Sequence, residues 1–122
     1  MSKTLFFIIY IFSATSFYSC EKLAKFEITN NTDERIDSFY ILPDNFKNNF
    51  IQIQPNSTST YKINMTDYPM VDGAYSLSFK AKTKNVFIPF GYFSNGNPAE
   101  SLTKIFIYSD TVLIHPEYDG RY

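Results

Sequence analysis

The sequence predicts a single all-β domain, built as a small antiparallel β-sandwich of about eight strands. The chain of 122 residues contains 13 Phe and 10 Tyr but no Trp, and aromatic and β-branched residues suit half-buried strands. Apolar and polar residues alternate in short segments, and turn-forming residues separate these segments at near-regular spacing. No segment shows a sustained helical period, so helical fold classes are not expected.

Individual segments carry this strand pattern with different clarity. The clearest is 74–81, where Tyr75, Leu77 and Phe79 alternate with mostly small or polar residues. Pro89 interrupts the segment 86–93, so that strand should lie at a sheet edge or contain a bulge. The residues 94–98 are expected to form a loop. The expected strands are 26–29, 36–42, 51–54, 60–65, 74–81, 86–93, 103–108 and 112–115.

One short segment favours a sandwich over a barrel. Residues 72–77 (DGAYSL) are similar to the corner before a core strand of immunoglobulin-like domains, where a Tyr hydroxyl bonds to loop backbone. The resemblance implies an immunoglobulin-like, Greek-key arrangement with Tyr75 at the corner and Leu77 in the core. The Cys and Trp of true immunoglobulin domains are absent, so the resemblance is to the architecture alone. The alternative, weighted equally, is that Tyr75 is one more core aromatic residue.

The first nineteen residues have the composition of a secretory signal. Lys3 supplies a positive charge, residues 5–12 form an apolar run of eight, and residues 13–16 are small or polar. A helix that crosses a bilayer needs about 20 apolar residues, so this run suits a signal peptide. The expected organisation is a signal peptide over 1–19, a modified cysteine with a short tether over 20–25, and a β-sandwich over 26–122.

The junction Ser19-Cys20 resembles the lipobox of bacterial lipoproteins, in which a small residue precedes the cysteine that becomes lipidated. Phe17 and Tyr18 occupy places where strict lipoboxes have Leu and a small residue. The junction is closer to the relaxed lipoboxes of Bacteroidetes-like lipoproteins, whose Phe-, Tyr-, Ile-, Asn- and Lys-rich composition the chain shares. The resemblance implies acylation of Cys20 and an outer-membrane location, with the leaflet left open. The alternatives are ordinary secretion after cleavage near residues 13–15 and an uncleaved anchor.

Cysteine content and charge are consistent with this location. Cys20 is the only cysteine, and lipidation would block a thiol that is otherwise a liability in an oxidising compartment. After residue 19 there are ten basic and twelve acidic side chains, a net charge of −2. The two signs are interspersed without a basic cluster. Strong nucleic-acid binding is therefore not expected.

No pattern of catalytic or metal-binding residues stands out, so neither enzyme activity nor a cofactor is expected. His115 is the only histidine, and its place beside Pro116 suits a structural or exposed role. Nothing resembles a nucleophile elbow, a phosphate-binding loop or a zinc site. Asp67 and Asp72 flank one loop, but their spacing matches no calcium-binding loop, and they are expected to keep the loop soluble.

The strand around Phe106 carries apolar residues on both faces. Ile105 and Ile107 lie on one face, and Phe106 and Tyr108 on the other. Packing between two layers is the preferred explanation. The alternative is an exposed aromatic surface for a protein partner or a glycan, because Tyr and Asn combine stacking with hydrogen bonding. The residues of that candidate surface are Tyr92, Phe93, Asn95, Phe106 and Tyr108.

A possible modification site follows this strand. Asp110-Thr111-Val112 resembles the short O-glycosylation motif of Bacteroidetes-like exported proteins, which implies a glycan on Thr111. The alternative is that Asp110 is present because it forms turns.

Together these features predict a membrane-anchored, non-catalytic binding or accessory module of the cell envelope. One alternative is an inhibitor or immunity lipoprotein against a toxin or hydrolase, which a flat, acidic or loop-rich face would favour. Another is a surface glycan-binding module, which exposed Tyr and Phe would favour. The fold alone does not choose between them.

The lipid anchor can be tested directly. Cells that express the wild-type chain should incorporate radioactive palmitate into it, and Cys20→Ala should abolish this labelling because the acylated thiol is gone. Undiminished labelling of the variant would contradict the assignment.

Overall fold

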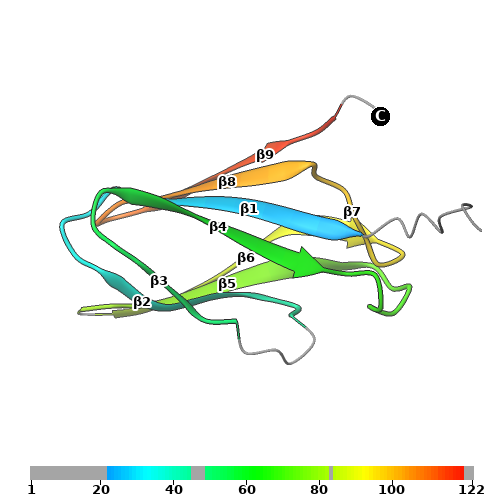
Figure 1. The fold of residues 1–122 in the computed structure, drawn as a ribbon, viewed down its shortest axis with the longest axis horizontal. Coiled ribbons are helices and arrows are strands. Elements are labelled where there is room, and N and C mark those ends of the chain that lie inside the picture. The colour runs from blue at the N-terminus through cyan, green and yellow to red at the C-terminus, as the bar shows by residue number, and fades with distance from the viewer. Residues whose placement is uncertain (1–21, 45–48, 83, 120–122) are drawn as a thin grey trace, which may run out of the picture.

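The computed structural model describes residues 22–44, 49–82 and 84–119. In this part of the chain, the strands are β1 (Leu23–Asn30), β2 (Ile36–Leu42), β3 (Ile51–Ile53), β4 (Ser57–Asn64), β5 (Gly73–Ala81), β6 (Lys84–Ser94), β7 (Asn97–Pro98), β8 (Leu102–Ile107) and β9 (Val112–Glu117). One sheet has the order β4-β1-β8-β9 and the other β3-β2-β5-β6-β7. Figure 1 shows the two sheets facing each other. The prediction of an all-β sandwich is confirmed.

The expected signal peptide, Cys20 and the start of its tether lie outside the described residues. None of the residues that the structure describes forms a helix long and apolar enough to cross a membrane.

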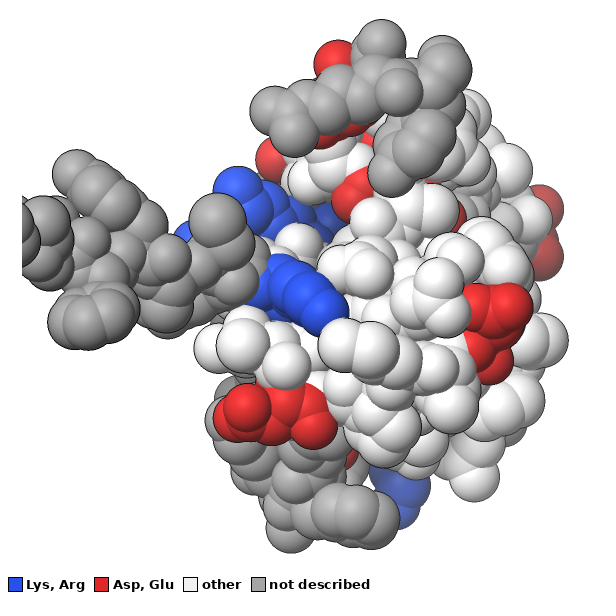
Figure 2. Space-filling model, turned by 90° about the vertical axis from the view of Figure 1, so that its right-hand side faces the viewer, with Lys and Arg blue, Asp and Glu red and all other residues white. Residues whose placement is uncertain are grey.

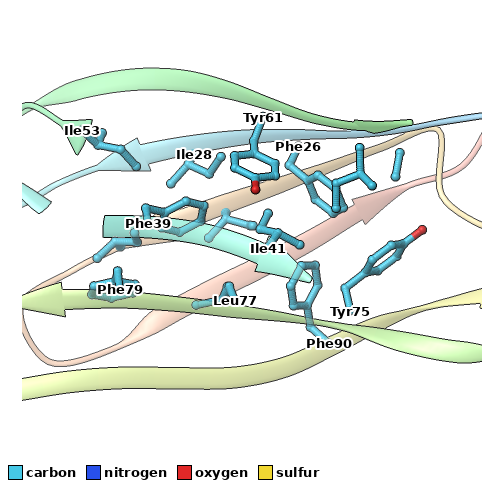
Figure 3. Close-up of a cluster of buried hydrophobic side chains, with 14 of the residues drawn as sticks. Phe26, Ile28, Phe39, Ile41, Ile53, Tyr61, Tyr75, Leu77, Phe79 and Phe90 are labelled. Atoms are coloured by element: carbon cyan, nitrogen blue, oxygen red, sulfur yellow. The ribbon is translucent and has the colours of Figure 1, made fainter. Parts of the chain in front are cut away.

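Alternation of side chains along each strand builds the core. In β1 the residues Ala24, Phe26 and Ile28 are buried, and in β5 Tyr75 and Leu77 are buried, each at every second position. Because a strand points successive side chains to opposite faces, one apolar face per sheet suffices to fill the space between the sheets. Figure 3 shows Phe26 and Ile28 from one sheet meeting Tyr75 and Leu77 from the other.

Aromatic rings dominate the centre of this core. Phe26 lies edge-on to Tyr75 and Phe90, with ring centroids 5.2 and 5.8 Å apart, and Phe39 stacks on Phe79 at 6.1 Å. Edge-on and offset arrangements place the positive edge of one ring against the negative face of another. The core therefore depends on ring geometry as well as on buried area.

Tyr75 belongs to this core. It is 1% exposed, and its hydroxyl donates to the Met65 sulfur at 3.7 Å rather than to loop backbone. Burial, together with the nearby Glu100 carboxylate, raises the pKa of Tyr75 well above its usual range, so the hydroxyl stays neutral. Of the two interpretations of Tyr75, the structure favours the core aromatic.

Several strand boundaries and one strand orientation differ from those predicted, among them the start of β4 at Ser57 and the end of β9 at Glu117. The first strand begins at Leu23 rather than at residue 26, because Ala24 is 2% exposed and pairs with Ile63. The expected tether over 20–25 is therefore too long. A short β7 pairs with Phe93 and Ser94 inside the segment expected to be loop. The pairing of β1 with β8 is parallel, whereas the other strand pairs described are antiparallel.

The strand that contains Pro89 was expected to lie at a sheet edge or to contain a bulge, and both are observed. β7 pairs with β6 only at the end of that strand, so Pro89 lies on an open edge. The pairing of β6 with β5 also shifts between Phe90 and Phe93, and Gly91 lies there with a φ of +66°. A Cβ at position 91 would come within 2.8 Å of the Tyr75 ring, so glycine is required by both backbone and packing.

Two Phe substitutions separate the core from the surface. Phe39→Ala should lower the free energy of unfolding by about 3–5 kcal/mol, because it leaves a cavity among stacked rings. Phe87 is 65% exposed, and Phe87→Ala should change the same quantity by less than about 0.5 kcal/mol. Urea denaturation followed by circular dichroism measures both. Equal effects of the two changes would contradict this arrangement of the core.

Candidate functional site

Three connections meet at the end of the sandwich opposite Lys22 and enclose a hollow of about 560 Å³. They are the β1–β2 loop (31–35), the β5–β6 hairpin and the β8–β9 turn (108–111). We call this hollow the loop-end pocket. It is lined by Asn31, Thr32, Asp33, Glu34, Arg35, Ile36, Phe79, Ala81, Lys84, Val86, Ile88, Ile107, Tyr108, Ser109, Asp110, Thr111 and Val112.

The loop-end pocket has an apolar floor and a polar rim. Ile36, Phe79 and Ile107 in the floor are buried, whereas Val86 and Ile88 are half-buried and extend the floor along β6. The three connections supply the charged and hydroxyl side chains of the rim. An apolar base with a few polar groups around it is the usual composition of a binding site of this volume.

Asn30 organises the β1–β2 loop. Its side chain is fully buried, and its Oδ1 accepts from the backbone N–H and the hydroxyl of Thr32 at 3.0 and 2.7 Å. Its Nδ2 donates to the carbonyl oxygens of Glu34, Ile53 and Gln54 at 2.8, 3.1 and 3.2 Å. A buried amide with all of its groups bonded fixes the segments that it touches. Asn30 therefore ties the pocket's first loop to the connection between β3 and β4.

Backbone hydrogen bonds hold two of the three connections that form the rim. The N–H of Asn31 donates to the Ile107 carbonyl at 2.8 Å, which joins the first loop to the end of β8. The N–H of Tyr108 donates to the Thr111 carbonyl at 2.8 Å and closes the β8–β9 turn. A rim that is already ordered loses little conformational freedom when a ligand binds. These two connections of the loop-end pocket are therefore already ordered without a ligand.

The charges on the rim are of both signs. Asp33, Glu34 and Asp110 are exposed acids, and Lys84 is an exposed base on the opposite hairpin. Arg35 forms an ion pair with Asp37, with Nε 2.9 Å from Oδ1. Because both partners are largely exposed, this pair adds little stability.

The structure corrects the preferred interpretation of the β8 aromatics. Ile105 and Ile107 face the core, with exposures of 0% and 2%. Phe106 is only half-buried, with its ring edge-on to His115 at 5.6 Å, and Tyr108 is 39% exposed at the pocket rim. Packing of these two rings between two layers is therefore wrong. Alternation showed that they share a face but not whether a second layer covers that face.

The remaining candidate surface residues lie at the other end of the sandwich. Tyr92 is 48% exposed, and Asn95 is exposed with its N–H donating to Asp72 Oδ1 at 2.9 Å. Phe93 is 3% exposed and packs against Tyr75, so its assignment to a surface is wrong. The five predicted residues therefore do not form one surface. Tyr108 alone among them lines the loop-end pocket.

The predicted modification site can also be placed. Thr111 is exposed on the pocket rim, so its hydroxyl is accessible to a modifying enzyme. Within the described residues, no three His, Cys, Asp or Glu side chains come together as metal ligands would. Cys20 lies outside the described residues.

Besides a hollow of about 710 Å³ at the Lys22 end, another of about 410 Å³ lies on the outer face of the β3-β2-β5-β6-β7 sheet. We call it the aromatic groove. Tyr40 and Phe50 meet edge-on there at 5.0 Å, and Phe87 is 65% exposed beside them. Ser38 lines the groove with a φ of +54°, at the irregularity where the register of β2 shifts. An exposed apolar patch with polar neighbours is typical of a binding surface.

Sequence reasoning missed both Asn30 and the aromatic groove. Asn30 had a local signal, because an Asn with Thr two residues later is a common pattern for a side chain that bonds its own loop. The groove had none, because Phe50 and Phe87 come from segments whose pairing the sequence does not specify.

In comparisons with known proteins, no family model matches this chain, and no curated protein or solved structure is significantly similar to it.

The role of Asn30 can be measured with a neighbour as control. Asn30→Ala should lower the free energy of unfolding by about 3 kcal/mol, because buried carbonyl groups lose their donor. Asn31 bonds through its backbone, so Asn31→Ala should change it by less than about 0.5 kcal/mol. Thermal or urea denaturation gives both values. A loss below about 1 kcal/mol for Asn30→Ala would show that the amide does not hold the loop.

Proposed function

We propose that this chain is a lipid-anchored, non-catalytic binding module of the bacterial outer membrane, and that its ligand site is the loop-end pocket. The observation that carries the proposal is the separation of the chain's exit from the pocket. Lys22, the described residue nearest to Cys20, lies at one end of the sandwich, and the pocket lies at the other.

The strands set the distance between these two ends. β1 has eight residues and runs from the exit to the pocket, so at about 3.3 Å per residue it spans roughly 26 Å. Figure 1 shows the strands of both sheets running along this long axis. If Cys20 holds lipid, the pocket points away from the bilayer, where a partner can reach it.

The chemistry of the pocket supports binding rather than catalysis. Acid–base and nucleophilic mechanisms usually place a His, Cys or tuned carboxylate beside the substrate. The described residues that line the pocket include neither His nor Cys. His115 is exposed and lies against Phe106.

The rim favours a protein as the ligand. Three connections form it, and Asp33, Glu34 and Asp110 give it an acidic part. A loop-rich rim around an apolar floor can accept an anchoring side chain while the loops contact the surrounding surface. This agrees with the inhibitor or immunity form of the function, in which the partner is a toxin or hydrolase.

Glycan capture is a second candidate, because of the aromatic groove. Phe50, Phe87 and Tyr40 offer ring faces and edges, and Lys80 and Asn85 offer hydrogen-bonding groups. Aromatic rings stack on the apolar faces of sugars while polar neighbours bond the hydroxyl groups. On this hypothesis the ligand site lies on the sheet face rather than at the end of the sandwich.

Site-specific cross-linking distinguishes the two sites. A photoreactive phenylalanine in place of Tyr108 should form an adduct with a discrete envelope protein in intact cells. The same group in place of Phe87 should not, and Thr60, exposed on β4, is the matched background position.

The reverse pattern, with binding to a glycan array that Phe87→Ala weakens about tenfold, would favour glycan capture instead. Adducts at Tyr108 no stronger than those at Thr60 would contradict the loop-end pocket as the ligand site.

A further inference from the structure

We propose that the loop between β4 and β5, residues 65–72, is a lipid-contacting surface, and that Met70 and Val71 enter the headgroup region of the bilayer. The inference rests on the proposed lipid anchor at Cys20. Met70 is 78% exposed and Val71 48% exposed. We call this segment the exit loop, because it adjoins the place where the chain leaves the domain.

Two hydrogen bonds hold the start of the domain, at Lys22, against this loop. The N–H of Met65 donates to the Lys22 carbonyl at 2.7 Å, and the N–H of Lys22 donates to the Thr66 hydroxyl at 3.1 Å. Lys22 is therefore fixed to the base of the exit loop. Cys20 is two residues away in the sequence, which is at most about 7 Å of chain. A lipid on Cys20 would bring the bilayer to this end of the sandwich.

The exit loop is held in a shape that keeps Met70 outward. Tyr68 turns inward and lies edge-on to Phe93, with ring centroids 5.4 Å apart. The Val71 carbonyl accepts from the N–H of Gly96 at 2.9 Å. These contacts fix the loop on both sides of Met70, so its side chain is presented to the surroundings by a braced backbone. Transfer of such an apolar side chain from water into an adjacent bilayer lowers the free energy of the system.

Apart from Asp67 and Asp72, the exposed acids of the loop itself, the surroundings of the loop suit a membrane interface. Tyr92 and Tyr118 are 48% and 57% exposed at this end, and Tyr is enriched where membranes meet water. Lys25 and Lys62 are exposed and directly paired across β1 and β4. Two like charges in such a pair repel each other, and anionic headgroups would relieve the repulsion. Figure 2 looks onto this end. Most of the described surface in that view belongs to residues other than Lys, Arg, Asp and Glu.

Depth-dependent fluorescence quenching tests the proposal on the full, lipidated chain. Met70→Cys carries an environment-sensitive fluorophore, and Ser109→Cys carries the same probe in the exposed β8–β9 turn at the other end. Both proteins are reconstituted into vesicles of phosphatidylethanolamine and phosphatidylglycerol that contain a lipid spin-labelled near the headgroup. The probe at position 70 should shift to the blue and be quenched at least about twofold more strongly than the probe at 109, because interfacial side chains lie about 5–10 Å deep.

A longer tether distinguishes contact of Met70 with lipid from mere closeness to the bilayer that a short connection to Cys20 would impose. A flexible insertion of about six Gly and Ser residues between Glu21 and Lys22 relaxes the restraint. Quenching at position 70 that persists supports the proposal, and quenching that falls to the level of position 109 overturns it. A chain that floats with the vesicles but shows no quenching at 70 overturns this inference alone. A chain that lacks acyl groups and does not float overturns the anchor and this inference together.

Discussion

The buried amide of Asn30 is the constraint on which the loop-end pocket depends. Its five hydrogen bonds reach its own loop and the connection between β3 and β4, so one side chain joins parts of both sheets. A buried amide without these partners would cost more than the bonds contribute, because its groups would lose water without replacement. The observed loop conformation satisfies the amide, and the rim of the pocket is built on that conformation.

β1 connects Asn30 to the rest of the domain through its two neighbouring strands. β1 lies between β4 and β8, antiparallel to the first and parallel to the second. Its start carries the chain's exit, and its end carries Asn30. The parallel pair places β1 beside β8, so two segments far apart in the sequence form the centre of this sheet. One strand thus connects the end proposed to meet lipid with the end proposed to meet a partner.

Much of the fold could be predicted from side-chain alternation, because burying one face of a strand requires it. The partners of each strand could not, since the parallel pairing of β1 with β8 leaves no local pattern. Alternation also gave wrong facings for side chains where an irregularity of the backbone interrupts the two-residue repeat of a strand. The irregularity at Gly91 shifts the phase, so Phe93 points inward and Tyr92 outward. The candidate site could be predicted only in part. The sequence indicated Tyr108 as a candidate surface residue, but the loops that surround it come together only in the folded chain.

The open edge of β6 bears on how neighbouring copies of the chain would meet if it is anchored as proposed. Proteins tethered to a membrane meet in two dimensions at high local concentration, and a free strand edge is a template for joining another copy. Pro89 lies on that edge and has no N–H to offer, which interrupts any ladder that a second chain could add. Pro116 occupies the same kind of position on β9, the outer strand of the other sheet. If the chain is lipid-anchored as proposed, the two prolines therefore favour separate molecules over edge-to-edge polymers.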